Sequence, residues 1–261
     1  MPKDENSIIQ SVDRALTLLN EIASTPGQPR NLTELSGIMG IDRSSVFRLL
    51  TTLARHGLIR QNANDKSYSL GYGIYGLASS LRVQEKITDL VNPYLKQIVK
   101  ETGENAHLAV SAGNRCVFID REQGTRTLTA NTNIGDTEEL YCTAVGKSLI
   151  CNLDRKELEE RLAGEPLTAY TANTITDMDA LFEELKTVRE TGAAVDNEEY
   201  EPNVFCMAAP IYNFESKIEA AVGLSGPKVR LKPREKEIRK LLKSISGEIS
   251  ATLGYRPAAA E

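Results

Sequence analysis

The stretch between residues 33 and 70 restricts the possible folds more than any other part of the chain. At its centre, apolar residues recur at the i, i+3, i+4 and i+7 spacing of one helix face. These residues are Val46, Leu49, Leu50 and Leu53. Asp42 or Ser44 would cap the start of this helix, and Gly57 would end it in a left-handed conformation. The pattern therefore predicts a helix from about residue 43 to residue 56.

Two further helices and a hairpin are predicted around this central helix. A short helix precedes it, with Thr33 as its N-cap and Gly40 as the turn between the two helices. Upstream, Val12, Ala15, Leu16 and Leu19 repeat the helical stripe after a capping Ser11. Residues 57–60 and 68–70 read as two short strands that form a β-wing. Three helices followed by a wing predict a winged helix-turn-helix.

The charges of this stretch favour binding to DNA. Between residues 43 and 70 the chain has five Lys or Arg residues and one acid, Asp65, whereas the whole chain has a formal charge of −5. Arginines read guanine edges, hydroxyls contact phosphates or bases, and Phe47 suits a thymine methyl. The candidate DNA contacts are Arg43, Ser44, Ser45, Phe47, Arg48, Thr52, Arg60 and Lys66. The alternative is a basic, solvated face of a small helical domain, which would show the same stripe.

Length and composition indicate an ordinary globular protein of two domains. The chain has 261 residues, of which 41% are hydrophobic and 26% charged. We find no apolar run long enough to span a bilayer and no signal-peptide pattern at the start, so we expect a cytoplasmic protein. The cysteines show no Cys-x-x-Cys spacing, and we expect reduced thiols, no metal site and no cofactor. They are Cys116, Cys142, Cys151 and Cys206.

The charge distribution locates a boundary near residue 73. Residues 1–73 carry eight basic and seven acidic side chains, so the remaining residues carry a net charge of −6. We predict a DNA-binding domain over residues 7–71, a connector helix over 72–87 and an effector domain over 88–255. An apolar stripe from Ile87 to Ile98 leads into the last of these, and Gly103 ends it.

The larger domain alternates predicted strands and helices. Strands are expected at 106–110, 115–120, 204–212 and 218–224, with residues 127–129 as an edge strand. Helices are expected at 144–152, 155–162, 177–191 and 233–253. This order fits an α+β fold, in which helices flank an antiparallel sheet.

Three sequence patterns suggest an enzyme, but the surrounding sequence argues against each of them. Gly71, Gly73 and Gly76 match a dinucleotide fingerprint, but the strand before them is a wing rather than the first strand of a βαβ unit. Cys142 and Cys206 have no neighbouring histidine, and the paired acids of the chain are adjacent residues typical of solvated faces. We therefore predict no catalytic residues, with a small-molecule enzyme bearing an accessory helical domain as the alternative.

Small residues between positions 141 and 148 indicate a ligand site at a helix start. Thr143, Ala144, Val145 and Gly146 would let a ligand approach the backbone, and the free N–H groups there favour an anion. The run is not a P-loop, because Tyr141 stands where the upstream glycine would be. Close packing of a helix is the alternative explanation for such a run.

Taken together, these features resemble the IclR family of bacterial transcriptional regulators over nearly the whole chain. Three blocks carry the resemblance. The first combines residues 11–19 (SVDRALTLL) with 43–50 (RSSVFRLL), and the second is 143–147 (TAVGK). The third, 196–211 (DNEEYEPNVFCMAAPI) leading to 223–227 (GLSGP), is the most specific.

The resemblance implies a winged helix, a connector helix that dimerises, and a GAF-like domain that binds a small effector, often an organic acid. It implies a homodimer or homotetramer on a palindromic operator, more often a repressor than an activator. Carried onto this chain, the effector contacts would be Ala144, Val145, Asp196, Cys206 and Ser225. Two positions depart from the family pattern. Cys142 replaces a frequent histidine. Gly223 replaces a ligand-contacting serine of some members, and this loss of a side chain suggests room for a bulkier ligand.

Overall fold

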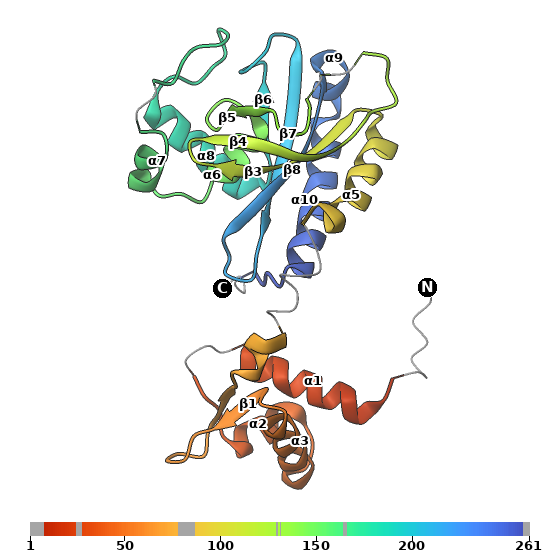
Figure 1. The fold of residues 1–261 in the computed structure, drawn as a ribbon, viewed down its shortest axis with the longest axis vertical. Helices are drawn as coiled ribbons and strands as arrows, with labels where there is room; N and C mark the ends of the chain where they lie inside the picture. The colour runs from red at the N-terminus through yellow and green to blue at the C-terminus, as the bar shows by residue number, and fades with distance from the viewer. Residues whose placement is uncertain are drawn as a thin grey trace. The chain divides into compact units, whose positions relative to one another are not determined.

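The computed structural model describes residues 8–24, 28–77, 87–128, 130, 132–163 and 166–257. The chain divides into two compact units, Met1–Glu85 and Lys86–Glu261. Each unit is described separately below (Figure 1). Among the described residues, no helix is both long and apolar enough to cross a membrane.

The N-terminal unit contains three helices and a two-stranded wing. The helices are α1 (Gln10–Ala23), α2 (Leu32–Met39) and α3 (Arg43–Arg55), and the antiparallel strands are β1 (Ile59–Gln61) and β2 (Tyr68–Leu70). Leu18, Leu35 and Leu50, one from each helix, are fully buried at its centre. The predicted helix-turn-helix and wing are therefore present; Gly57 adopts the predicted left-handed conformation, and Gly40, the predicted turn residue, adopts it as well.

Two predicted helix starts are wrong. Helix α2 is capped by Asn31, whose side chain accepts hydrogen bonds from the backbone N–H groups of Thr33 and Glu34. The carboxylate of Glu34 in turn accepts from the Asn31 N–H, which completes a capping box that Thr33 cannot form. Helix α1 begins after Ile9 rather than at Ser11, and its N-cap side chain makes no capping hydrogen bond.

The predicted buried stripe of α1 is also displaced. Val12 and Leu16 are 52% and 53% exposed, whereas Leu18 and Ile22 lie in the core of the unit. Both stripes have helical spacing, so the pattern alone did not decide which one packs inward. An exposed apolar surface therefore remains on the outer face of α1.

The glycines after the wing serve close backbone packing. A Cβ atom on Gly71 would lie 2.2 Å from the carbonyl oxygen of Gly57, and one on Gly73 would lie 2.7 Å from the same oxygen. Only glycine fits at such contacts, so close backbone packing explains Gly71 and Gly73 without a bound dinucleotide. Residues 73–77 are helical. The rest of the predicted connector, at 78–86, lies outside the described residues.

The C-terminal unit is built on a six-stranded antiparallel sheet in the order β5-β4-β3-β8-β7-β6. The strands are β3 (Asn105–Ala112), β4 (Arg115–Glu122), β5 (Thr137–Glu139), β6 (Ala194–Asn197), β7 (Val204–Tyr212) and β8 (Ile218–Pro227). Four of them match predicted strands. The predicted edge strand at 127–129 is wrong for 127 and 128, and residue 129 lies outside the described residues. Thr137–Glu139 forms that edge instead, and β6 was not predicted.

Helices cover both faces of this sheet (Figure 1). Helices α5 (Ile87–Thr102) and α10 (Glu235–Thr252) pack on one face, and α6 (Ala144–Ile150) and α8 (Met178–Thr191) on the other. Short helices α7 (Arg155–Arg161), α9 (Lys228–Leu231) and η2 (Lys232–Arg234) complete the unit. Each face has its own apolar core, so the α+β prediction is confirmed.

Candidate nucleic-acid interface and ligand pocket

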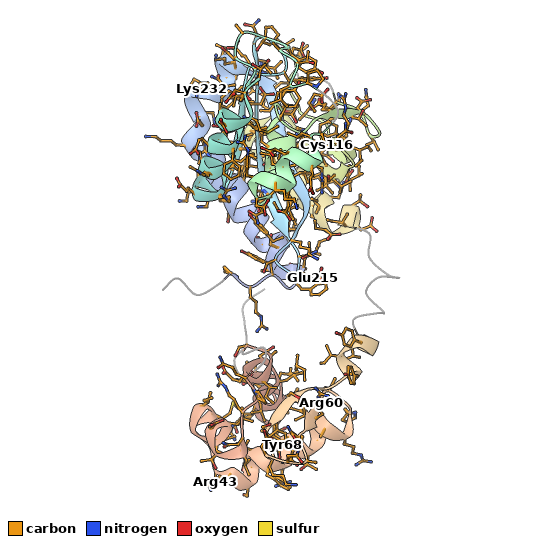
Figure 2. All side chains as sticks on the ribbon, turned by 90° about the vertical axis from the view of Figure 1, so that its left-hand side faces the viewer. Arg43, Arg60, Tyr68, Cys116, Glu215 and Lys232 are labelled. Atoms are coloured by element: carbon orange, nitrogen blue, oxygen red, sulfur yellow. The ribbon has the colours of Figure 1, made fainter. Side chains whose placement is uncertain are left out.

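The predicted DNA contacts lie on the surface of the N-terminal unit. Seven of the eight are exposed and Ser45 is half-buried. Phe47 is 52% exposed although it is a large apolar side chain next to the buried Val46. Figure 2 labels Arg43 at the start of α3 and Arg60 on the wing. Exposed arginines beside an exposed aromatic ring form the kind of surface that enters a DNA groove.

The hydroxyl groups of this surface are already engaged. Ser44 and Ser45 donate hydrogen bonds to the carboxylate of Asp42 at 2.6 and 2.7 Å, and the Ser45 N–H donates to the same carboxylate at 2.9 Å. These bonds hold the pKa of Asp42 well below its ordinary value. Thr52 donates to the carbonyl oxygen of Arg48. To donate to a phosphate, either serine must leave Asp42, a constraint that the sequence did not reveal.

The wing places two cations at its edges. Arg60 Nε donates to Ser69 Oγ at 3.1 Å, and its guanidinium lies 5.6 Å from the ring centre of Tyr72. Lys66 has a φ of +58°, a conformation that ends the turn of the wing. The guanidinium of Arg60 is thus held by contacts along the hairpin, whereas Lys66 takes part in the turn through its backbone N–H and carbonyl groups.

A cavity of about 330 Å³ lies in the C-terminal unit. It brings together six of the seven predicted effector contacts, which come from positions up to 82 residues apart in the chain. The six are Thr143, Ala144, Val145, Asp196, Cys206 and Ser225. A wider depression of about 710 Å³ lies on the N-terminal unit near Arg30 and Glu34, but it is open and shallow. The smaller cavity, called the pocket below, is the more enclosed of the two and is therefore the better ligand site.

Strand register explains how distant residues meet in the pocket. Asp196 in β6 pairs with Cys206 in β7, and Cys206 pairs with Ser225 in β8. The three side chains therefore form one row across three neighbouring strands. The helix start at Thr143 and Ala144 lies against the same face of the sheet. Pairing partners on hydrogen-bonded strands share a face, which the sequence alone could not show before the strands were aligned.

Two of the lining side chains are buried without a hydrogen-bond partner. Ser225 is 3% exposed and its Oγ has no partner, and the same holds for Nδ1 of His107, which is 4% exposed. Burial lowers the pKa of His107 to about 4, so its ring is neutral at physiological pH. Buried polar atoms are normally satisfied. These two atoms are therefore positioned to bond a ligand.

Several lining residues were not predicted from the sequence. The walls include Phe118, whose ring meets that of His107 edge to face at 5.1 Å between centres, and Tyr200. The further unpredicted lining residues are Ala130, Thr132, Asp136, Thr137, Glu138, Glu201 and Val204. His107 also lines the pocket and was not predicted as a site residue. Its place on a predicted strand gave a signal, but only the pairing with β8 shows that it faces Ser225's side of the sheet.

Two sequence interpretations of this region need correction. Gly146 does not line the pocket: its N–H donates to Thr143 Oγ at 3.1 Å, and backbone atoms of Glu139 and Leu140 fill the space where a Cβ would lie. Gly223 gives no extra room to a ligand either. A Cβ there would lie 2.7 Å from Met207 O and 3.2 Å from His107 Nε2, so the glycine accommodates the histidine ring. Cys142 is fully buried outside the lining.

Carboxylates dominate the electrostatics of the pocket. Burial, together with the charges of Asp196, Asp136 and Glu201, raises the pKa of Glu138 to about 7. Burial likewise raises the pKa of Asp196 to about 6, although its carboxylate accepts the Glu199 N–H at 2.7 Å and is attracted by Lys147. Four acids line the pocket, and its described lining contains no lysine or arginine.

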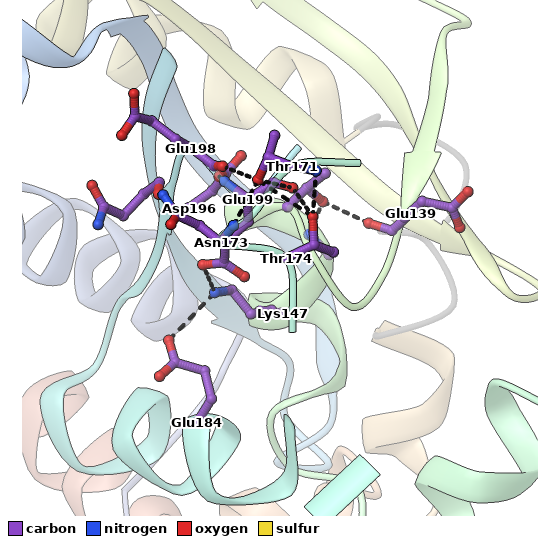
Figure 3. A network of polar contacts seen from close by, with 12 residues as sticks. Glu139, Lys147, Thr171, Asn173, Thr174, Glu184, Asp196, Glu198 and Glu199 are labelled. Carbon is purple, nitrogen blue, oxygen red and sulfur yellow. Dashed lines mark hydrogen bonds and ion pairs between the residues drawn. The ribbon is translucent and has the colours of Figure 1, made fainter. Parts of the chain in front are cut away.

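A buried ion pair lies behind Asp196 (Figure 3). Lys147 of α6 is fully buried, and its Nζ lies 2.5 Å from Glu199 Oε1 and 3.3 Å from Glu184 Oε1 of α8. Glu199 belongs to the loop between β6 and β7, which also carries the lining residues Tyr200 and Glu201. The ion pair thus fixes that loop to the helix at the other side of the pocket.

A second set of contacts holds the same loop. Thr171 Oγ1 donates to the carbonyl oxygen of Glu198 and Thr174 Oγ1 to that of Glu199, both at 2.6 Å. The rings of Tyr170 and Tyr200 lie 4.9 Å apart between centres. This network positions the wall of the pocket from outside it (Figure 3).

Comparison with known families gives two matches that together span most of the chain. Residues 11–63 match the IclR helix-turn-helix domain, and residues 80–251 match the C-terminal domain of the bacterial transcriptional regulator IclR. The chain is 33% identical to the HTH-type transcriptional regulator XynR of Escherichia coli, over 95% of this chain and 98% of that one. It is 30% identical to the transcriptional repressor IclR of E. coli, over 85% and 82%.

Solved structures agree with these matches. A putative IclR transcriptional regulator from Silicibacter sp. TM1040 superposes with a TM-score of 0.87 at 25% identity, covering 96% of this chain and 98% of that one. The IclR of Thermotoga maritima superposes with a TM-score of 0.62 at 31% identity, covering 94% and 99%. Both units of the chain therefore have counterparts in one protein family.

Proposed function

Because the chain belongs to the IclR family of bacterial transcriptional regulators, we propose that it represses promoters by binding a palindromic operator, with an affinity that a small metabolite modulates. Transcriptional regulation, rather than catalysis, is the function that its relatives share, and the alternative of an enzyme is overturned. Repression is proposed because relatives such as AllR of Salmonella typhi and IclR of E. coli are named repressors. A regulator of promoters acts on the chromosome, so we place the protein in the cytoplasm.

The observation that carries the DNA-binding part is the surface of α3. Arg43, Phe47 and Arg48 are exposed on a helix whose opposite face, through Val46 and Leu50, is buried. In this arrangement we infer that α3 enters the major groove while Arg60 and Lys66 of the wing contact the backbone beside it. Residues 7–71 are the proposed DNA-binding domain.

An exposed apolar surface supports a symmetric assembly. Ile9, just before α1, and Val12 and Leu16 on α1 are more than half exposed, and so are Tyr72 and Tyr75 after the wing. Apolar patches of this kind commonly mark protein interfaces. A homodimer, or a homotetramer made of two dimers, would present two α3 helices to half-sites about one helical turn apart. Sedimentation equilibrium distinguishes these assemblies from a monomer.

The pocket supports the ligand-responsive part of the proposal. It encloses unsatisfied atoms of His107 and Ser225, and a ligand that binds them would stabilise the conformation in which it fits best. Residues 88–255 are the proposed effector domain. The resemblance implies an organic acid as the ligand, and the acidic lining of the pocket argues against that part of the expectation.

Replacing Arg48 by alanine tests base reading. We expect Arg48→Ala to weaken binding to a specific operator by about 1–3 kcal/mol, because a bidentate contact to guanine is lost. The operator is first selected from random duplexes with the unmodified full chain, and affinity is then measured by fluorescence anisotropy at physiological salt.

Lys240→Ala is the matched control, because it removes an equal charge from an exposed position of α10. Its operator affinity should equal that of the unmodified chain. If Arg48→Ala binds as tightly as Lys240→Ala, Arg48 does not read DNA. If no duplex is enriched in the selection, the proposal of an operator-binding regulator fails.

A further inference from the structure

The chemistry of the pocket lining indicates which ligands it accepts. Asp196 and Glu138 lie within it, while the more exposed Asp136 and Glu201 stand where the lining reaches solvent. Because the described lining has no cation to offset them, the pocket offers hydrogen-bond acceptors in excess. A ligand carboxylate would add a further negative charge beside these acids in a cavity of about 330 Å³, and like charges at short range repel.

Two side chains of the same pocket have buried polar atoms that lack a hydrogen-bond partner. Ser225 Oγ is buried beside Cys206 and Asp196 in one cross-strand row, and His107 Nδ1 is buried within the same lining. A buried polar atom without a partner is costly, so a ligand that reaches both atoms gains affinity by satisfying them. These two buried atoms without partners indicate a ligand site independently of the acidic residues.

The remaining walls restrict the size and shape of the ligand. Phe118, Val145, Val204 and Tyr200 contribute apolar and aromatic surface. A volume of about 330 Å³ is at the lower end for small-molecule sites, which suits a compact metabolite. Aromatic rings beside carboxylates accommodate either the C–H faces of a polyol or an ammonium group.

From this arrangement, and on the premise of the proposed function, we propose that the effector presents hydrogen-bond donors, either hydroxyl or ammonium groups, to Glu138 and Asp196. Hydrogen bonds from such donors to carboxylates are charge-assisted and therefore strong. Ser225, which can both donate and accept, completes the contacts. A simple carboxylate without such donors does not fit this lining.

Three five-carbon probes separate the sources of these donors. Ribitol carries hydroxyls, 1,5-diaminopentane carries ammonium groups and glutarate carries only carboxylates. Calorimetric titration of the full chain at pH 8 should give at least tenfold tighter binding of ribitol or diaminopentane than of glutarate. Tightest binding of glutarate, or no binding of any probe at 10-millimolar concentration, would overturn the proposal.

The variant Glu138→Gln tests the role of one carboxylate without changing the side-chain volume. We expect it to weaken the better donor probe at least tenfold, whereas the control Glu190→Gln on the exposed end of α8 changes nothing. Unchanged binding by Glu138→Gln, or an equal loss in both variants, would contradict the assignment. Operator affinity of the same preparation, measured without any probe, reports separately on the proposed function.

The pH dependence gives an independent readout with a predicted sign. Glu138 faces Asp136, Asp196 and Glu201 and has a pKa of about 7, so it becomes protonated between pH 8 and pH 6. The other titratable or charged groups near Glu138 and Asp196 are Cys206, His107, Lys147, Glu199, Tyr200, Cys116 and Cys142. Donor probes should bind more weakly at pH 6 than at pH 8. Tighter binding at pH 6 would indicate that the pocket prefers anions, and would overturn the proposal.

Discussion

Lys147→Met is expected to lower the free energy of unfolding of the C-terminal unit by about 3–5 kcal/mol. The lysine is fully buried, and its removal leaves the carboxylate of Glu199 buried without its 2.5 Å partner. Methionine keeps the volume, so a cavity does not explain the loss. Hydrogen exchange followed by mass spectrometry measures the effect, because its peptides report on the two units separately.

Two controls separate the ion pair from a general surface effect. Lys156→Met breaks an exposed contact to Glu160 at 3.7 Å and should leave exchange unchanged. The double variant Lys147→Met/Glu199→Gln removes the unpaired charge and should recover part of the stability. Equal exchange in Lys147→Met and the unmodified chain would show that the buried pair does not stabilise the unit.

Leu50→Ala is expected to destabilise the N-terminal unit by about 2–5 kcal/mol and to abolish operator binding. Leu50 is fully buried in a small core with Leu18 and Leu35, which offers little other apolar surface to compensate for the cavity. The same exchange experiment should show faster exchange in α1 to α3 and unchanged exchange in the C-terminal unit.

The neighbouring substitution Phe47→Ala is the matched control for this prediction. Phe47 is 52% exposed, so its loss should leave the stability of the N-terminal unit nearly unchanged while weakening operator binding. If Leu50→Ala retains full operator affinity, α3 does not need this core to present its arginines. If Phe47→Ala destabilises the unit, the ring packs inward and the proposed DNA surface is wrong.

Local patterns predicted most of the fold. Helical spacing around Val46 and Leu50, the glycines at 40 and 57, and the successive strands at 204–212 and 218–224 each depend on near neighbours in the chain, and the structure confirms all three. The failures have a common cause. Two helical stripes compete on α1, and the edge position of Thr137–Glu139 depends on pairing with β4, so both are decided by tertiary contacts.

The residues of the pocket were harder still to predict from local sequence patterns. The resemblance named Asp196, Cys206 and Ser225, and strand register places them in one row. Nothing in the sequence identified Glu138 or Tyr200, because they reach the pocket from a short edge strand and a loop. Gly223 was misread for a similar reason, since the atoms that meet its empty side belong to Met207, Ala208 and His107, the last of them 116 positions away.

The central claim is that occupation of the pocket changes the affinity for DNA. The most direct measurement is an operator titration of the full chain with and without the tightest-binding probe at saturating concentration. We predict a change in operator affinity of about 5- to 150-fold, together with loss of that change in Glu138→Gln. Identical operator affinity with the pocket fully occupied, as verified by calorimetry on the same sample, would contradict it.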